Sequence, residues 1–136
     1  MKNLSTAIFS KMTSSTDLYS DIGGRLFKDF APDGAEYPYI VYSVASNSPD
    51  NVFSGNYEET TIQFNLFSSA SGSTEVEDMY EHLIALYDEC SLMITAQTLI
   101  WMRRENATLM VEDHTVKNGT VQVWRYAVDY RITAKV

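Results

Sequence analysis

The chain has 136 residues, of which 45% are hydrophobic and 12% aromatic, and its formal net charge is -8 at pH 7. This length and composition exclude a disordered protein and predict that residues 1–136 form a single domain with its own core. The acidic charge repels phosphate backbones, which excludes sequence-specific nucleic-acid binding as a direct role.

A helix is predicted over residues 3–12, with a shorter helical turn after it. Apolar residues recur in the first segment at helical spacing: Leu4, Ile8 and Met12. Such a stripe is typical of an amphipathic helix that lies on a core. Thr16 is placed to cap the short turn through its hydroxyl group. Gly23-Gly24 ends the turn, because glycine reaches positive φ without steric cost.

Turn signals and strand signals follow each other between residues 25 and 44. We expect residues 25–27 to be extended. The Pro-Asp-Gly sequence at 32–34 predicts a β-turn with the proline at the first central position. Pro38 cannot donate a hydrogen bond to a strand ladder, so it marks the start of a strand that continues through Val44.

Segment 46–56 is rich in asparagine, serine and aspartate and contains a proline. This composition predicts a long polar loop, with the extended tip of a hairpin as the alternative. The strand after it is the clearest in the chain, because apolar and polar residues alternate. Its apolar positions, which predict one dry face, are Ile62, Phe64 and Leu66.

A helix signal begins at Thr74, whose hydroxyl group is placed to form a capping box with Glu77. Residues at helical spacing then form an apolar stripe: Val76, Met79, Tyr80, Leu83, Leu86, Tyr87 and Cys90. We expect this stripe to lie on a sheet. The acidic residues opposite it are interpreted as a solvated face rather than as a carboxylate pair for acid–base chemistry.

Two acidic residues near the end of this helix, Asp88 and Glu89, oppose the helix dipole. We hypothesise that they meet a basic group on a neighbouring subunit. The motivation is the isolated basic pair Arg103-Arg104.

The last third of the chain predicts strands over 99–104 and 121–133, with a looser stretch around 109–111. The turn at 117–120 contains Asn118-Gly119, a strong hairpin signal. The final strand carries large residues on one face and charges on the other, as in a central strand. Together these elements predict an α+β fold: a mostly antiparallel sheet with one long and one or two short helices packed on one face.

Residues for catalysis or cofactor binding are not evident in the sequence. A single cysteine excludes an internal disulfide, and we interpret Cys90 as a small apolar residue at the end of a helix. His82 is predicted on a solvated helix face and His114 in a polar loop, without metal-ligand spacing. We therefore expect no enzyme activity, no metal and no cofactor.

Export and membrane signals are also weak. Apolar residues near the N-terminus are interrupted by Ser10 and Lys11, so we expect no signal peptide. No segment approaches the ~20 apolar residues that cross a bilayer, so we expect no membrane partner.

Several motifs occur together in an informative order: Gly-Gly-Arg at 23–25, Ala-Pro-Asp-Gly-Ala at 31–35, Tyr-Pro-Tyr at 37–39, Phe-Asn-Leu-Phe-Ser at 64–68, the helix at 75–87 and the strand at 124–131. In this combination the chain resembles the tail completion, or tail terminator, proteins of long-tailed bacteriophages and prophages. Phe67 stands where that family often has tryptophan, and Trp124 where it often has none.

The resemblance implies a structural minor tail protein at the head-proximal end of the virion tail, present in the host cytoplasm during assembly. Proteins of this family have a sheet with helices packed on it. They form hexameric rings that cap the tail tube, stop its polymerisation and present a surface for head-tail joining. The implied partners are further copies of the chain, the tail tube protein and the head-tail connector protein, with genome DNA passing through the ring.

Long polar segments and the basic pair are the candidate assembly interface, because loops of this kind become ordered on a partner. The candidate residues are Asn47, Asp50, Asn51, Phe53, Arg103, Arg104 and Asn118. We also hypothesise that a ring of such acidic subunits has an acidic lumen through which DNA passes without sticking.

Two other interpretations stay open. The chain could be another head-tail connector, such as an adaptor or head-closure protein. It could also be a small-molecule-binding or enzymatic α+β domain with a tyrosine-lined pocket, although the periodic tyrosine positions fit core packing better.

Overall fold

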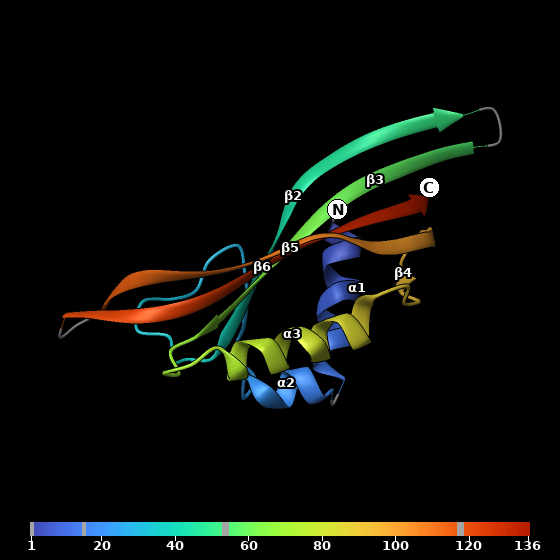
Figure 1. Cartoon of the computed structure of the whole chain (residues 1–136). Helices are drawn as coiled ribbons and strands as arrows, with labels where there is room; N and C mark the ends of the chain where they lie inside the picture. The colour runs from blue at the N-terminus through green and yellow to red at the C-terminus, as the bar shows by residue number, and fades with distance from the viewer. Residues whose placement is uncertain (1, 15, 53–54, 117–118) are drawn as a thin grey trace.

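The computed structural model describes residues 2–14, 16–52, 55–116 and 119–136. Within them, helices pack on one face of a strongly twisted six-stranded sheet (Figure 1). The elements in chain order are α1 (Lys2–Thr13), α2 (Asp17–Asp21), β1 (Leu26–Lys28), β2 (Tyr39–Val52), β3 (Gly55–Ser68), α3 (Thr74–Tyr87), β4 (Met93–Ile94), β5 (Gln97–Val116) and β6 (Gly119–Lys135).

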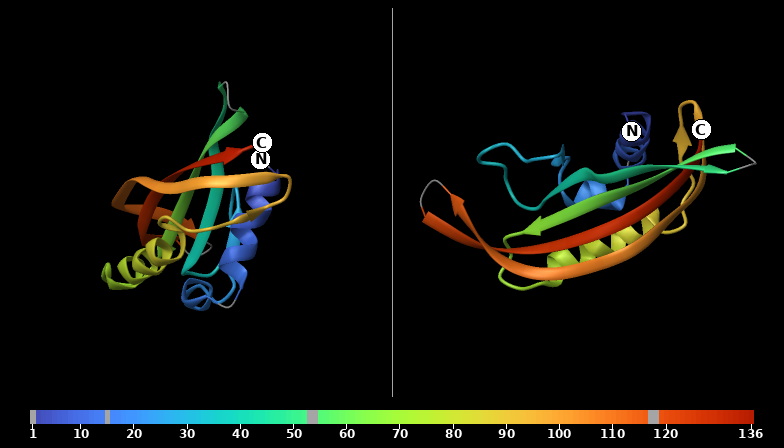
Figure 2. Two further views of the ribbon diagram at one scale, coloured as in Figure 1. Left: turned by 90° about the vertical axis from the view of Figure 1, so that its right-hand side faces the viewer. Right: turned by 90° about the horizontal axis from the view of Figure 1, so that it is seen from above.

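The strands lie side by side in the order β1-β2-β3-β6-β5-β4. β1 runs parallel to β2, and every other neighbouring pair is antiparallel. β3 and β6 lie at the centre of the sheet, with the long strands β2 and β5 beside them. These long strands curve past the helices (Figure 2). The predicted α+β class, the mostly antiparallel sheet and the central position of the last strand are therefore confirmed.

One core joins the helices to the sheet. Alternate residues of β3 and β6 face the helices and are fully buried: Ile62, Phe64, Leu66, Val128, Tyr130 and Ile132. The predicted helical stripes cover them, and the Tyr87 hydroxyl donates to the Ile8 carbonyl at 2.7 Å, which ties α3 to α1. Each fully buried large apolar side chain stabilises the fold by roughly 1.5–3 kcal/mol.

The N-terminal helices follow the predictions closely. Thr16 caps α2 by accepting a hydrogen bond from the Tyr19 amide at 3.1 Å. Gly23 and Gly24 then take φ values of 57° and 81°, which a side chain would strain. The chain reverses there and enters β1 at Leu26.

Two predicted details of turns and caps are wrong. The turn at 32–34 exists, but the Ala35 amide donates to the Pro32 carbonyl at 3.2 Å, so the proline is its first residue and not a central one. α3 has Ser73 at its N-cap with no side-chain capping bond, so Thr74 forms no capping box. Glu77 accepts instead from the Ser73 hydroxyl at 3.2 Å.

Two segments predicted as irregular are strands. The described residues of segment 46–56 are not a loop, because β2 and β3 pair as far as Val52 and Gly55, which leaves the extended hairpin as the correct alternative. The stretch at 109–111 belongs to the continuous strand β5. Register shifts at Leu99/Trp101 and Arg104/Asn106 interrupt the alternation of its side chains.

Candidate assembly surfaces

Hairpins project at opposite ends of the sheet, and each is defined here as an arm (Figure 1). The β2–β3 arm comprises residues 46–52 and 55–61. The β5–β6 arm comprises residues 112–116 and 119–123. β3 stops pairing with β6 at Ser68 and Trp124, so the β5–β6 arm is a two-stranded ribbon.

The β2–β3 arm holds three of the seven predicted interface residues, Asn47, Asp50 and Asn51. The Asn47 side-chain amide donates to the Thr60 hydroxyl at 2.8 Å, across the two strands. Asp50 and Asn51 are paired through the backbone with β3. Phe53 lies outside the described residues. β1 pairs with β2 only at residues 40–42, so the outer edge of this arm has no neighbouring strand within the described chain.

The basic pair lies on β5, beside the end of α3. Arg103 contacts Glu89 at 3.3 Å and stacks over the Trp101 ring at 4.5 Å. Arg104 contacts Asp88 at 3.2 Å. The acidic residues therefore meet their basic partners within the same chain, and the hypothesis that they need a neighbouring subunit is wrong.

Asp88 contacts side chains of both β5 and β6. It accepts a hydrogen bond from the Tyr130 hydroxyl, and Arg104 donates to the Tyr80 hydroxyl. Burial, together with this bond to Asp88, raises the pKa of Tyr130 well above its ordinary value, so the phenol stays protonated. The cluster therefore fixes the C-terminal end of α3 against β5 and β6.

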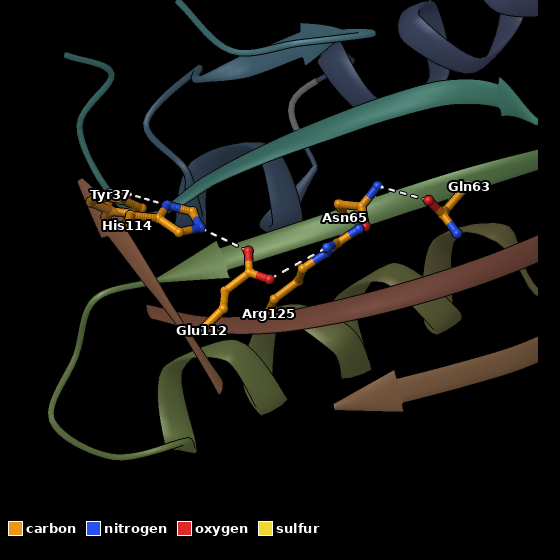
Figure 3. A network of polar contacts seen from close by, with 6 residues as sticks. All are labelled: Tyr37, Gln63, Asn65, Glu112, His114 and Arg125. Atoms are coloured by element: carbon orange, nitrogen blue, oxygen red, sulfur yellow. Dashed lines mark hydrogen bonds and ion pairs between the residues drawn. The ribbon is translucent and has the colours of Figure 1, made fainter. Parts of the chain in front are cut away.

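A chain of polar side chains crosses the sheet on the face away from the helices (Figure 3). We call it the polar network. His114 contacts the Tyr37 hydroxyl through Nδ1 at 2.7 Å and Glu112 through Nε2 at 2.7 Å. Arg125 reaches Glu112 at 3.4 Å and donates to Asn65 at 2.9 Å. The network thus joins the β5–β6 arm to β3 and to the segment before β2.

The network continues along β3. Asn65 donates to Gln63 at 3.2 Å, and Gln63 donates to Asp129 at 3.0 Å. Aromatic rings lie beside its other end, since Phe67 is 5.4 Å from the His114 ring and 4.9 Å from the Tyr39 ring. Side chains, not a third strand, therefore hold the base of the β5–β6 arm.

The electrostatics of the network favour a charged Glu112. Partial burial opposes its ionisation, but the hydrogen bond from His114 and the charge of Arg125 outweigh this and hold the pKa of Glu112 below its ordinary value. With Nε2 donating to Glu112, Nδ1 of a neutral His114 accepts the hydrogen bond from Tyr37.

A tyrosine, a histidine and a carboxylate in line resemble a proton relay, but the direction of the pKa shift does not favour Tyr37 as a nucleophile. Burial and the negative charge of Glu112 raise the pKa of Tyr37, although a hydrogen bond with Tyr39 acts the other way. An activated hydroxyl nucleophile would need the opposite shift. What the contacts do in this structure is join the segment before β2 to β5, β6 and β3.

Sequence reasoning missed this network. It placed His114 in a polar loop, whereas the residue lies in β5 with its ring half-buried. Its partner Tyr37 is 77 positions away in the sequence, so no local spacing reveals the contact. The alternation of Glu112 and His114 on one side of a strand was the only available signal.

Other predicted residues have simple surroundings. His82 lies on α3 and contacts Asp21 at the end of α2, and this hydrogen bond raises the pKa of His82. Cys90 lies beyond α3 and is half-buried, with its sulfur 3.6 Å from that of Met102. Asn118 lies outside the described residues, although the strands on either side of it pair as the predicted hairpin.

The described part of the chain has no group of three or more histidine, cysteine or carboxylate side chains placed to hold a metal ion. Its helices are also too short or too polar to cross a bilayer. A hollow near the network has a volume of about 780 Å³ and lies between residues 31–35 and the β5–β6 arm. Tyr37, Tyr39 and His114 contribute to its wall.

Comparisons with known proteins give one family and one similar fold. The family model described as tail completion protein gp17 matches residues 6–133. Among solved structures, a chain from the "virion of native gene transfer agent (GTA) particle" is similar with a TM-score of 0.73 at 10% sequence identity. The similarity covers 96% of this chain and 93% of that chain. None of the curated proteins matches the sequence.

Proposed function

Because this chain belongs to the tail completion protein gp17 family, we propose that it forms a ring that caps the tail tube, stops tube polymerisation and joins the tail to the head. It is a tail completion protein, a structural component of a phage-like particle and not an enzyme. The observation that carries the proposal is the family match over residues 6–133, nearly the whole chain.

The architecture supports a ring. A closed ring of identical subunits needs a heterologous contact, in which one surface of a subunit meets a different surface of the next. This molecule is elongated, with different structures at its two ends (Figure 2). A stable contact of this kind usually buries ~1,600 Å² in total.

The partners follow from this role. Further copies of the chain would form the ring, which we take to be hexameric. The tail tube protein would bind one side of it and the head-tail connector protein the other, at the head-proximal end of the tail. Genome DNA would pass through the ring, whose lumen we propose to be acidic because each subunit carries a net charge of -8.

The β2–β3 arm is the proposed contact with the tube or with an adjacent subunit. Its outer edge is free, and Asn47, Asp50 and Asn51 follow one another along it. Arg103 is more than half exposed despite its contact with Glu89, so it remains available to a partner. Phe53, Arg104 and Asn118 complete the proposed interface.

Tube assembly tests the proposal directly. Purified tube protein is allowed to polymerise with and without the chain, and tube length is measured by electron microscopy. We expect the chain to limit tube length and to bind immobilised tubes and immobilised connector protein. Unchanged tube length, with binding to the connector alone, would instead indicate an adaptor or head-closure protein.

Shortened arms give matched variants. Removing residues 50–51 together with 56–57 shortens the β2–β3 arm by two residue pairs and keeps the alternation of its strands. Removing 115–116 with 119–120 does the same to the β5–β6 arm. We expect the first variant to fold and to lose tail attachment. Normal attachment by this variant would show that the arm is not the contact.

A further inference from the structure

Phe30 is an aromatic side chain that the fold presents to solvent. It is 77% exposed, the largest value for any aromatic residue among the described exposed hydrophobics. Its position is set by backbone hydrogen bonds. The Phe30 amide donates to the Lys28 carbonyl at 2.8 Å, and the Asp29 amide donates to the Tyr42 carbonyl at 2.9 Å. Asp29 takes a φ of 70°, which is uncommon for a residue other than glycine. An ordered turn therefore holds Phe30 outward.

A recess with both apolar and polar wall residues lies around β4. It has a volume of about 550 Å³, within the ~300–1,000 Å³ that ligand pockets usually occupy. Its apolar wall residues include Leu92, Met93, Leu99 and Ile100. Met93 is 95% exposed and Ile100 is 43% exposed, so water covers much of this wall in the isolated chain. Methionine adapts readily to an incoming side chain.

The turn and the recess lie at opposite ends of the molecule. The segment between β1 and β2 is at one end of the sheet, and β4 is at the other, as both views show (Figures 1 and 2). Phe30 therefore cannot reach the recess of its own chain. An apolar side chain that fits a pocket at the far side of an identical molecule produces a head-to-tail contact, which closes into a ring or extends as a filament.

Charged residues lie beside both surfaces. Asp29 is exposed and directly precedes Phe30, and the exposed Lys28 lies one residue before Asp29. Lys11 lies on α1, the helix that contacts β4. Burial raises the pKa of Cys90, a wall residue of the recess, overall, although the charge of Lys11 acts to lower it. Among the described residues, neither Asp29 nor Lys11 takes part in an ion pair. Docking would bring the two charges together at the rim of the contact.

We propose that Phe30 of one subunit inserts into the recess around Met93 of a second copy of the chain, with Asp29 facing Lys11. This inference rests on the proposed ring and names its subunit contact. A central aromatic anchor in an apolar pocket, bordered by polar residues, is the usual arrangement of an interface hot spot.

Cysteine cross-linking tests the contact. The variant carries Phe30→Cys and Met93→Cys in a Cys90→Ser background, and it is oxidised mildly in the presence of tail tubes. The two new thiols cannot meet within one chain, so we expect a ladder of covalently linked subunits. Either substitution alone should give no ladder. A ring that assembles without any ladder would overturn the contact.

Substitutions provide an independent measurement. Phe30→Ala should weaken subunit association about tenfold or more, as expected for a hot spot. Val111→Ala, which shortens an exposed side chain on β5, is the matched control and should change association little. Asp29→Lys and Lys11→Glu should each weaken assembly, and the double variant should regain it. Equal association of wild type and Phe30→Ala would contradict the inference.

The outcomes also separate this inference from the proposed function. If the Phe30→Ala variant forms a ring on tubes as well as the wild type does, the proposed function is retained and the proposed contact is rejected. A wild-type chain that stays monomeric with and without tail tubes would reject both.

Discussion

The two arms are held in different ways. The β2–β3 arm is supported by a third strand, because β6 pairs with β3 from Tyr57 onward. The β5–β6 arm projects beyond β3 and is anchored at its base by the polar network of Glu112, His114 and Arg125. The strands of each arm pair with each other through the backbone, but a third strand supports the β2–β3 arm, whereas side-chain contacts support the β5–β6 arm.

This difference separates stability from assembly. Side-chain contacts respond to single substitutions and to pH, so the stability of the β5–β6 arm should change with both. The β2–β3 arm keeps its backbone pairing when surface side chains change. Its side chains can therefore be suited to binding a partner without loss of the strand structure. Two of its residues, Asn47 and Thr60, bond across the strands and add locally to this support.

The largest expected effect comes from Arg125→Ala. This substitution removes the donors to Asn65 and Glu112 and leaves a partly buried carboxylate without its cation. We expect a loss of about 1.5–3 kcal/mol in the free energy of unfolding, measured by urea denaturation. The reason is that unsatisfied charged groups cost more than the bond itself contributes.

Arg131→Ala is the matched control on the same strand. Arg131 pairs with Glu105 at 2.8 Å, but the side chains are 49% and 37% exposed. An exposed pair of this type contributes only about 0.2–1 kcal/mol. Equal losses for the two variants would show that the polar network adds no more than a surface ion pair.

Acid should weaken the β5–β6 arm. The pKa of Glu112 is lower in the folded chain than its ordinary value of 4.5. The unfolded chain therefore binds the extra proton first, and the contribution is fully present above pH 4.5 and is lost as pH falls through the folded pKa. Glu112→Gln should flatten this part of the profile of unfolding free energy against pH. Superimposable profiles for wild type and variant would exclude Glu112 as the cause.

The smallest expected effect has the opposite pH dependence and involves a contact between α2 and α3. The hydrogen bond with Asp21 raises the pKa of His82, although burial acts against it. This contribution is fully present below the ordinary value of 6.5 and is lost as pH rises through the folded pKa. Asp21→Asn should remove it, as measured by urea midpoints on either side of pH 6.5. A midpoint difference between variant and wild type that does not depend on pH would contradict this assignment.

Much of the fold could be predicted from the sequence, because local chemistry determines it. The alternation of Ile62, Phe64 and Leu66 predicted β3, and the Gly23-Gly24 pair predicted the reversal before β1. The β2–β3 arm was taken for a loop because its polar strands need no apolar side chains when backbone bonds hold them. The stretch at 109–111 of β5 was taken for a looser one because the register shift at Arg104/Asn106 interrupts the alternation along this strand.

The candidate site was harder to predict, because its contacts join residues far apart in the sequence. The sequence near His114 does not indicate a contact with Tyr37. The sequence near Asp88 does not indicate that its basic partner is Arg104 of the same subunit. The same limit applies to Phe30. Its exposure follows from the backbone hydrogen bonds of the turn that holds it and could not be predicted from the amino acids around it. Family resemblance, carried by short motifs, was more informative here than any reactive residue.

Imaging of tube ends tests the central claim most directly. Purified tail tubes are incubated with the chain, examined by electron microscopy and averaged at their ends, while light scattering gives the mass of the chain without tubes. The account predicts a ring at one end of each tube, built from several copies of the chain. Tubes with unoccupied ends, together with a chain that stays monomeric, would contradict it.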